Sequence, residues 1–264
     1  MALSMRVLAL VTGLALAVAH AAAAPSAAGG AALRAQLERL SQQRVFFAHQ
    51  SVGKNLLDGL GRLARADGVA LRIEDVYIPE NGDPLLKLRN FEREVDSRAG
   101  TIDVAMLKFC YDDIGADTDV AALFEQYRAT LGRLERRYPE IAFVHVTVPL
   151  TREQQGLKAI AKRLIGRRPS GTVENVRREE YNALLRSAYL GREPFFDLAS
   201  VESHTSEGRA VTVTWKGRRA PALAPEYTED GGHLNVAGSL RAARELVAVL
   251  AATVPASLSA SAGR

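Results

Sequence analysis

The stretch Arg44–Leu60, "RVFFAHQSVGKNLLDGL", decides the fold because it joins a buried strand to a helix. The apolar run of residues 45–48 has the composition of a strand inside a sheet, and it stops at His49-Gln50-Ser51. From Gly53 onward, leucines recur at helical spacing. A serine at such a junction is either a helix cap or a nucleophile held at the end of a strand. The local sequence leaves both interpretations open.

Strand and helix patterns alternate along the rest of the chain. The expected strands cover residues 45–48, 71–76, 102–107, 141–148 and 194–198, and the expected helices cover 53–66, 84–96, 120–138, 173–190 and 236–252. This alternation predicts βαβ units and a mostly parallel sheet of about five strands, with helices on both faces. Residues 208–223 alternate with period two instead, which predicts a β-hairpin inserted before the last helix.

The first residues have the pattern of a secretory signal peptide. Arg6 precedes an apolar core of residues 7–19 and a run of alanines, with cleavage expected among Ala21–Ala24. A membrane anchor is the alternative, although the apolar core is shorter than the ~20 residues that span a bilayer. We therefore expect a signal peptide (1–24), a linker with an N-terminal helix (25–43), one catalytic domain (44–254) and a flexible tail (255–264). The location implied is secreted or periplasmic.

Composition limits the classes of partner. The formal net charge is +4, or +3 without Arg6 (4 − 1), which is too mild to indicate nucleic acid. Basic residues gather in residues 157–171. A solvated helix face is the simpler interpretation, and a surface that binds an anionic glycan or lipid is the more specific one. Cys110 is the sole cysteine, so no intramolecular disulfide can form. The oligomeric state is not determined.

A base for Ser51 is found near the C-terminus, in "YTEDGGHLNVAGSL". Asp230 precedes His233 by three residues across two glycines, so its carboxylate can fold back and accept a hydrogen bond from the imidazole. The alternative is an Asx-type turn with Asn235 capping the last helix and His233 simply exposed. His145, within an apolar strand, is expected to be a core histidine.

A serine after the first strand and Asp-x-x-His before the last helix together resemble the SGNH (GDSL-like) hydrolase family. The resemblance runs from about Arg44 to Leu250, and a helix with Asn182 followed by a strand ending at Asp197 adds to it. It implies a flavodoxin-like three-layer α/β/α fold. It also implies that Ser51 is the nucleophile, His233 the general base and Asp230 the acid of a catalytic triad.

The sequence departs from the family pattern around the oxyanion site. His49-Gln50-Ser51 stands where the family has Gly-Asp-Ser, and "LKFCYDD" has no asparagine where the family has one after its third strand. Gly82 is the expected counterpart of the family's glycine donor. The missing donor is expected to be replaced by Lys108, Tyr111, a backbone N–H, or the side chain of His49 or Gln50.

The resemblance predicts an exported serine esterase that hydrolyses small acyl esters, acetyl groups on glycans being the leading substrate, without cofactor or metal. An O-acyltransferase using the same triad is the nearest alternative, since only the acceptor differs. A non-catalytic glycan-binding module on the same fold is a second alternative. The substrate and the acyl chain length are left open.

Overall fold

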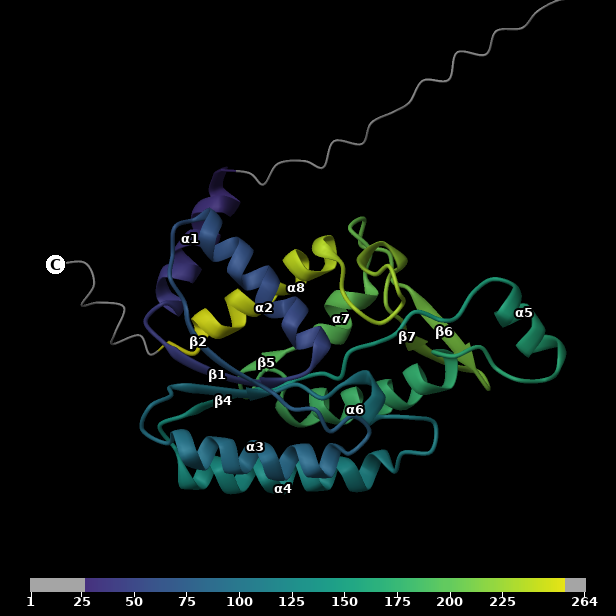
Figure 1. Cartoon of the computed structure of the whole chain (residues 1–264), viewed down its shortest axis with the longest axis horizontal. Coiled ribbons are helices and arrows are strands. Elements are labelled where there is room, and N and C mark those ends of the chain that lie inside the picture. Colours follow the sequence, from purple (N-terminus) through teal and green to yellow (C-terminus); the bar gives the residue numbers. More distant parts are fainter. Residues whose placement is uncertain (1–26, 255–264) are drawn as a thin grey trace, which may run out of the picture.

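The computed structural model describes residues 27–254 and has one five-stranded sheet with helices on both faces (Figure 1). The strand order is β2-β1-β3-β4-β5, and each neighbouring pair is parallel. This is the flavodoxin-like order. The three-layer α/β fold expected from the sequence is confirmed. None of the described helices is long and apolar enough to span a membrane.

The strands of the main sheet are β1 (Arg44–His49), β2 (Arg72–Tyr77), β3 (Val104–Leu107), β4 (Ala142–Val146) and β5 (Phe195–Phe196). The helices are α1 (Ala27–Leu40), α2 (Ser51–Ala66), α3 (Pro84–Arg98), α4 (Val120–Arg137), α5 (Leu157–Leu164), α6 (Thr172–Tyr189), α7 (Leu198–Ser203) and α8 (Val236–Ala252), with short 3-10 turns η1 (Tyr111–Asp113) and η2 (Pro225–Tyr227). The expected hairpin is present as antiparallel β6 (Thr212–Trp215) and β7 (Arg218–Pro221).

Strand β1 shows why the apolar runs fold in this way. Val45 and Phe47 belong to the core cluster that the sheet forms with α1, α2 and α8. Phe46 and Ala48 point to the other face, into the cluster formed with α3, α4 and α6. Because successive side chains alternate between faces, a strand covered on both sides must be apolar at every position. Figure 1 shows the two helical layers above and below the sheet.

Most element boundaries differ from expectation by one or two residues, and three of them illustrate a local reason. Helix α2 begins at Ser51 rather than Gly53, because Val52 is already fully buried in the core. Strand β4 ends at Val146, shortly before the Val148 amide, which donates to Asn182 Oδ1 on α6 (2.7 Å) instead of to a neighbouring strand. Strand β5 ends at Phe196 because Asp197 caps α7, accepting from Ser200 N.

The expected signal peptide (1–24) and the expected tail (255–264) lie outside the described residues. Helix α1, which the sequence placed ahead of the catalytic domain, packs into the same core as α8 through Leu37 and Leu40, both fully buried.

Candidate functional site at the carboxyl ends of β1 and β3

Ser51 is the first residue of α2 and follows β1 after one residue. Gln50 holds the N-cap position with an extended backbone, and its side chain makes no capping hydrogen bond. The interpretation of Ser51 as the helix cap is therefore wrong. Its side chain is partly exposed, and its N–H is one of the first four helix amides that have no partner within the helix. Such amides favour negative charge at a helix N-terminus.

His49 and Gln50 are both buried and tie the end of β1 to β2. Gln50 Nε2 donates to the carbonyl of Ile78 (2.5 Å), and its Oε1 has no hydrogen-bond partner among the described residues. His49 Nδ1 lies 2.8 Å from the Gln50 carbonyl oxygen, and Nε2 lies 3.0 Å from Asp75 Oδ2. At 2% and 1% exposure, the two side chains are out of direct reach of a substrate.

Asp230 and His233 form the compact turn that their spacing predicted. Asp230 Oδ2 lies 2.5 Å from His233 Nδ1, while Oδ1 accepts from the backbone N–H groups of Gly232 (2.9 Å) and His233 (2.8 Å). Gly231 adopts the left-handed conformation (φ +92°) that the turn requires. Asp230 thus makes an Asx turn with Oδ1 and contacts the His233 imidazole with Oδ2.

The surroundings keep the Asp230 carboxylate charged. Burial alone would raise the pKa of Asp230, but the hydrogen bonds from the backbone of His233 and Gly232 and from the His233 ring hold that pKa well below its usual range. A charged carboxylate at Nδ1 fixes the tautomer of the imidazole and leaves Nε2 to act as a base. Asn235 caps α8 independently, accepting from Gly238 N at 3.0 Å.

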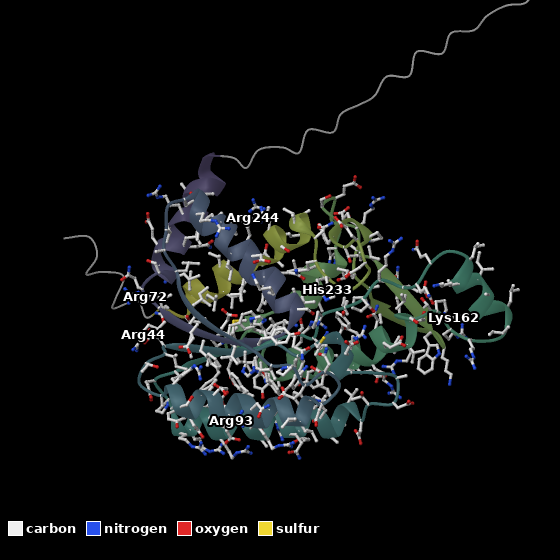
Figure 2. All side chains as sticks on the ribbon, in the orientation of Figure 1. Arg44, Arg72, Arg93, Lys162, His233 and Arg244 are labelled. Atoms are coloured by element: carbon white, nitrogen blue, oxygen red, sulfur yellow. The ribbon has the colours of Figure 1, made fainter. Side chains whose placement is uncertain are left out.

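A hydrogen bond joins this turn to the helix that starts at Ser51. Asn55 Oδ1 accepts from the backbone N–H of Leu234 (3.1 Å), the residue after His233. Residues four apart share one face of a helix, so Ser51 lies one turn from Asn55 on that face. Figure 2 shows His233 beside the end of α2. Sequence analysis missed Asn55, although its i+4 relation to Ser51 is visible in "SVGKN".

Tyr111 lies against the other side of the Asp-x-x-His turn. Its ring packs edge-on against His233 with 6.0 Å between centroids. A Cβ atom at Gly232 would lie 3.1 Å from the Tyr111 hydroxyl, so a larger residue there would require the Tyr111 ring to shift by a few tenths of an ångström. Burial, together with nearby negative groups including Asp230, raises the pKa of Tyr111 to about 12. At neutral pH the hydroxyl therefore keeps its proton and can donate a hydrogen bond.

Two other expected donors are engaged elsewhere. The Gly82 amide donates to Asp113 Oδ1 (3.0 Å), and Asp113 also forms a buried ion pair with Lys87 (2.6 Å). Lys108 is fully buried and donates to the Phe109 carbonyl (3.0 Å). Burial lowers the pKa of Lys108 to about 8. In this structure neither group is free to meet a substrate, whereas Tyr111 lies next to the proposed base.

A polar cleft of about 560 Å³ opens beside the Asp230 turn. Its walls include Tyr111, Arg152, Glu174 and Arg178, with Asp230 at one side. A smaller hollow of about 350 Å³ lies across the turn, lined by Asn55, Arg62, His233 and other residues. The Asp-x-x-His turn therefore separates two hollows, both mainly polar in their side chains.

Arg178 and Glu202 are site-supporting residues that the sequence did not single out. Arg178 Nε donates to the Tyr111 carbonyl (3.0 Å), and its guanidinium lies 5.7 Å from the Tyr111 ring centre. Glu202 Oε2 accepts from Leu150 N (2.8 Å), and burial raises the pKa of this carboxyl to about 8. Both lie among ordinary helix residues in the sequence, so only the tertiary contacts reveal them.

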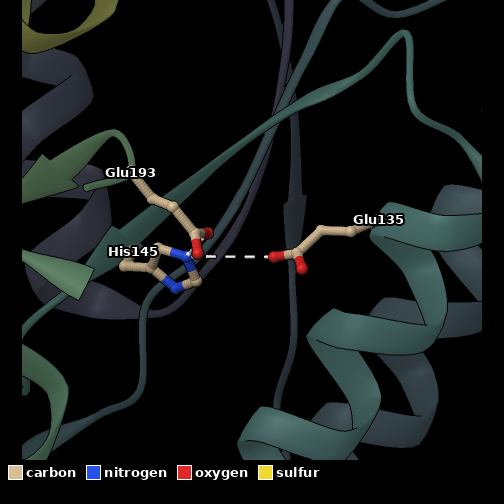
Figure 3. Close-up of side chains that lie close together, drawn as sticks. All are labelled: Glu135, His145 and Glu193. Atoms are coloured by element: carbon tan, nitrogen blue, oxygen red, sulfur yellow. Dashed lines mark hydrogen bonds and ion pairs between the residues drawn. The ribbon is translucent and has the colours of Figure 1, made fainter. Parts of the chain in front are cut away.

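A separate cluster of Glu135, His145 and Glu193 lies at the β4–β5 side of the sheet (Figure 3). His145 is fully buried, as expected for a core histidine. Its Nδ1 lies 2.8 Å from the Tyr127 hydroxyl and its Nε2 lies 2.8 Å from Glu193 Oε2. Both ring nitrogens thus have protein partners. We place this cluster outside the candidate site.

The chain matches no protein-family model and no curated protein. Among solved structures it is similar to a putative platelet activating factor from Streptococcus pneumonia, at 18% identity over 84% of this chain and 92% of that one, with a TM-score of 0.52. It also matches a putative SGNH hydrolase from Slackia heliotrinireducens (14% identity; 79% and 98% covered; TM-score 0.49). The periplasmic domain of a lipopolysaccharide acetyltransferase from Salmonella ser. Paratyphi A is another match (15%; 78% and 83%; 0.48). At these identities the similarity is one of fold.

Proposed function

We propose that this protein is a serine esterase that removes small acyl groups, acetyl groups foremost, from a hydroxyl-rich substrate such as a glycan. The observation that carries the proposal is the chain of contacts from Asp230 to His233 and, through Leu234 and Asn55, to the helix that begins with Ser51. It joins an acid and a base to the helix that carries the hydroxyl, and these are the three groups that nucleophilic catalysis needs.

The proposed reaction has two halves. Ser51 Oγ attacks the ester carbonyl while His233 Nε2 takes its proton, and Asp230 stabilises the resulting imidazolium. When the tetrahedral intermediate collapses, the ester bond breaks and His233 returns the proton to the departing alcohol. Water then attacks the acyl-enzyme with His233 as base, which releases the carboxylic acid and restores Ser51.

In this mechanism the negative charge on the carbonyl oxygen is held by two donors. One is the Ser51 N–H at the start of α2, and the other is the Tyr111 hydroxyl, which takes the role of the absent asparagine. The position of Tyr111 against His233 and its protonated state support this assignment. Removing one donor of this kind typically costs about 10²–10³ in rate.

His49 strengthens the first donor without touching the substrate. The Gln50 carbonyl and the Ser51 N–H belong to one peptide unit, and that carbonyl accepts from both the His49 ring and Lys54 N (3.1 Å). Hydrogen bonds at the carbonyl polarise the unit and make its N–H a better donor. Each His49 ring nitrogen faces an oxygen atom, Nδ1 the Gln50 carbonyl and Nε2 the Asp75 carboxylate, so Asp75 orients the ring toward the Gln50 carbonyl.

The polar cleft favours a substrate with many hydroxyl groups. Arg152, Glu174 and Arg178 offer charged donors and acceptors beside Asp230, and apolar walls for a long acyl chain do not dominate the lining. An acyltransferase that passes the acyl group to a sugar hydroxyl is the second candidate, because it would use the same acyl-enzyme and differ only in the acceptor. Export remains part of the proposal on the amino-terminal sequence, and N-terminal sequencing of secreted protein would test cleavage after residues 21–24.

The test combines a chromogenic acetate ester with active-site labelling. Wild-type protein should hydrolyse the ester and should be labelled by a fluorophosphonate, and Ser51→Ala should lose both while unfolding at the same temperature. Turnover that survives in Ser51→Ala overturns the triad. A lack of labelling and of turnover in the wild type would instead favour the glycan-binding module. Acetylated sugar formed at the expense of acetate would identify the transferase.

A further inference from the structure

Helix α5 exposes an unusual amount of apolar surface. Eight large apolar side chains are exposed in the described part of the chain, and four of them fall within nine residues: Leu157 (85%), Ile160 (51%), Leu164 (82%) and Ile165 (69%). Figure 1 shows α5 projecting from the body of the molecule, beyond the hairpin β6–β7. Singly exposed apolar residues are common on protein surfaces, but a contiguous group marks an interaction site.

The apolar stripe faces away from the protein. Leu157, Ile160 and Leu164 are spaced i, i+3 and i+7, so they share one face of the helix. Ala159, a buried residue of α5, lies on the other side of the helix. A surface helix normally turns its apolar face to the core. This one turns its smallest apolar residue inward and its leucines toward solvent.

The charge of the segment is uniformly positive. Residues 154–173 contain five Lys or Arg residues and no Asp or Glu. Lys158, Arg167 and Arg168 are exposed, and none of the three forms an ion pair with a carboxylate in the described part of the chain. Lys162, which Figure 2 labels on α5, donates to Ser170 Oγ (2.8 Å).

We propose that α5 docks on an anionic lipid bilayer, with its leucines inserted among the acyl chains and its basic residues against the headgroups. Apolar and basic side chains on one short helix are the combination that an interfacial helix uses. A soluble anionic glycan would engage the basic residues but gives no role to the leucines. An apolar protein partner would bury the leucines but gives no role to a segment without acidic residues.

Docking would also orient the candidate site. A hydrogen bond from Gln154 N to the Ser170 carbonyl (2.8 Å) joins the two ends of the segment that carries α5. Arg152 N donates to the carbonyl of Gly231 (2.8 Å), within the Asp-x-x-His turn. The polar cleft lies between these two attachments. A bilayer under α5 would therefore keep the cleft close to the membrane surface, although the docking itself does not depend on catalysis.

The experiment measures co-sedimentation of the protein with vesicles. We expect binding to vesicles of phosphatidylcholine mixed with phosphatidylglycerol, and little binding to phosphatidylcholine alone. The paired variant Leu157→Ser/Leu164→Ser should lose at least about tenfold in affinity, because two apolar side chains no longer leave water. Leu190→Ser is the matched control, since Leu190 is also exposed (54%) but lies at the end of α6, and it should bind like wild type.

Charge and insertion are separated by salt and by a second variant. Arg167→Gln/Arg168→Gln should weaken binding, whereas Arg93→Gln on α3 should not. Binding that disappears entirely at about 1 M salt, where the Debye length is ~3 Å, would indicate charge attraction alone and overturn insertion. Equal binding by wild type and the leucine variant would also overturn the proposal, as would no binding to anionic vesicles. Circular dichroism of each variant establishes that a loss is not due to unfolding.

Discussion

Asn55 Oδ1 and the backbone N–H of Leu234 meet at 3.1 Å, although 179 residues separate them along the chain. The bond connects the second turn of the helix that starts at Ser51 with the residue following His233. It is thus a direct contact between the helix of the proposed nucleophile and the turn of the proposed base.

Replacing Asn55 by Ala should lower kcat/KM about ten- to a hundredfold, because the partly buried Leu234 N–H loses its acceptor and the His233 turn loses its anchor. Asn55→Asp keeps an acceptor and should recover most of the activity. Steady-state kinetics on an acetate ester measure both. If Asn55→Ala kept full activity, the bond would have no positioning role.

Replacing Asp230 by Asn should reduce kcat by about 10³–10⁴, because an amide cannot stabilise the imidazolium and can favour the wrong tautomer. The turn should survive, since an amide oxygen still accepts from the Gly232 and His233 amides. Asp96→Asn, an exposed carboxylate on α3 that pairs with Arg137, serves as the control. A small effect of Asp230→Asn with intact folding would contradict the role of Asp230.

Replacing Tyr111 by Phe should lower kcat about 10²–10³-fold and leave KM nearly unchanged, because the hydroxyl is proposed to act only on the developing oxyanion. Packing of the ring against His233 is retained, so the melting temperature should stay within a few degrees. Tyr138→Phe, far from the site, should behave like wild type. An effect confined to KM would mean that Tyr111 binds the substrate instead.

Replacing Asp75 by Asn should lower kcat about three- to tenfold, because His49 loses the carboxylate that orients and polarises its ring toward the Gln50 carbonyl. KM should not change, since neither residue faces the substrate. Single-turnover acylation of Ser51 is the most direct measurement. A variant that acylates at the wild-type rate would show that the His49–Asp75 pair only joins β1 to β2.

Stability should fall as pH rises toward 8, because burial raises the pKa of Glu202 to about 8 from an unfolded value near 4.3. A carboxyl whose folded pKa is raised favours the folded state most below its unfolded pKa, and this contribution is lost as pH rises through the folded pKa. Glu202→Gln keeps an acceptor for Leu150 N, and its stability relative to wild type should increase between pH 5 and 8.5 in urea unfolding. A difference that is constant with pH would mean that Glu202 does not titrate in this window.

Local patterns predicted the elements best where the chain is uniformly buried. The apolar runs at residues 45–48 and 102–107 had to be strands covered on both faces, and the structure divides their side chains between two cores. Boundaries were less predictable where a side chain from a distant element forms a hydrogen bond with the backbone near the end of a strand. Strand β4 ends because Asn182 on α6 receives the Val148 amide, a contact that no local pattern contains.

The sequence by itself determined the parallel α/β order, the hairpin and the Asp230–His233 pair, because these depend on periodicity and on a three-residue spacing. The tertiary structure decided what the residues around them do. It set Ser51 inside α2 rather than at its cap, engaged Gly82 and Lys108 with buried partners, and brought Tyr111 and Asn55 to the turn of His233. Those outcomes depend on which strand ends become neighbours and which polar groups are left unpaired when the core closes. Spacing along the chain does not encode either of these directly.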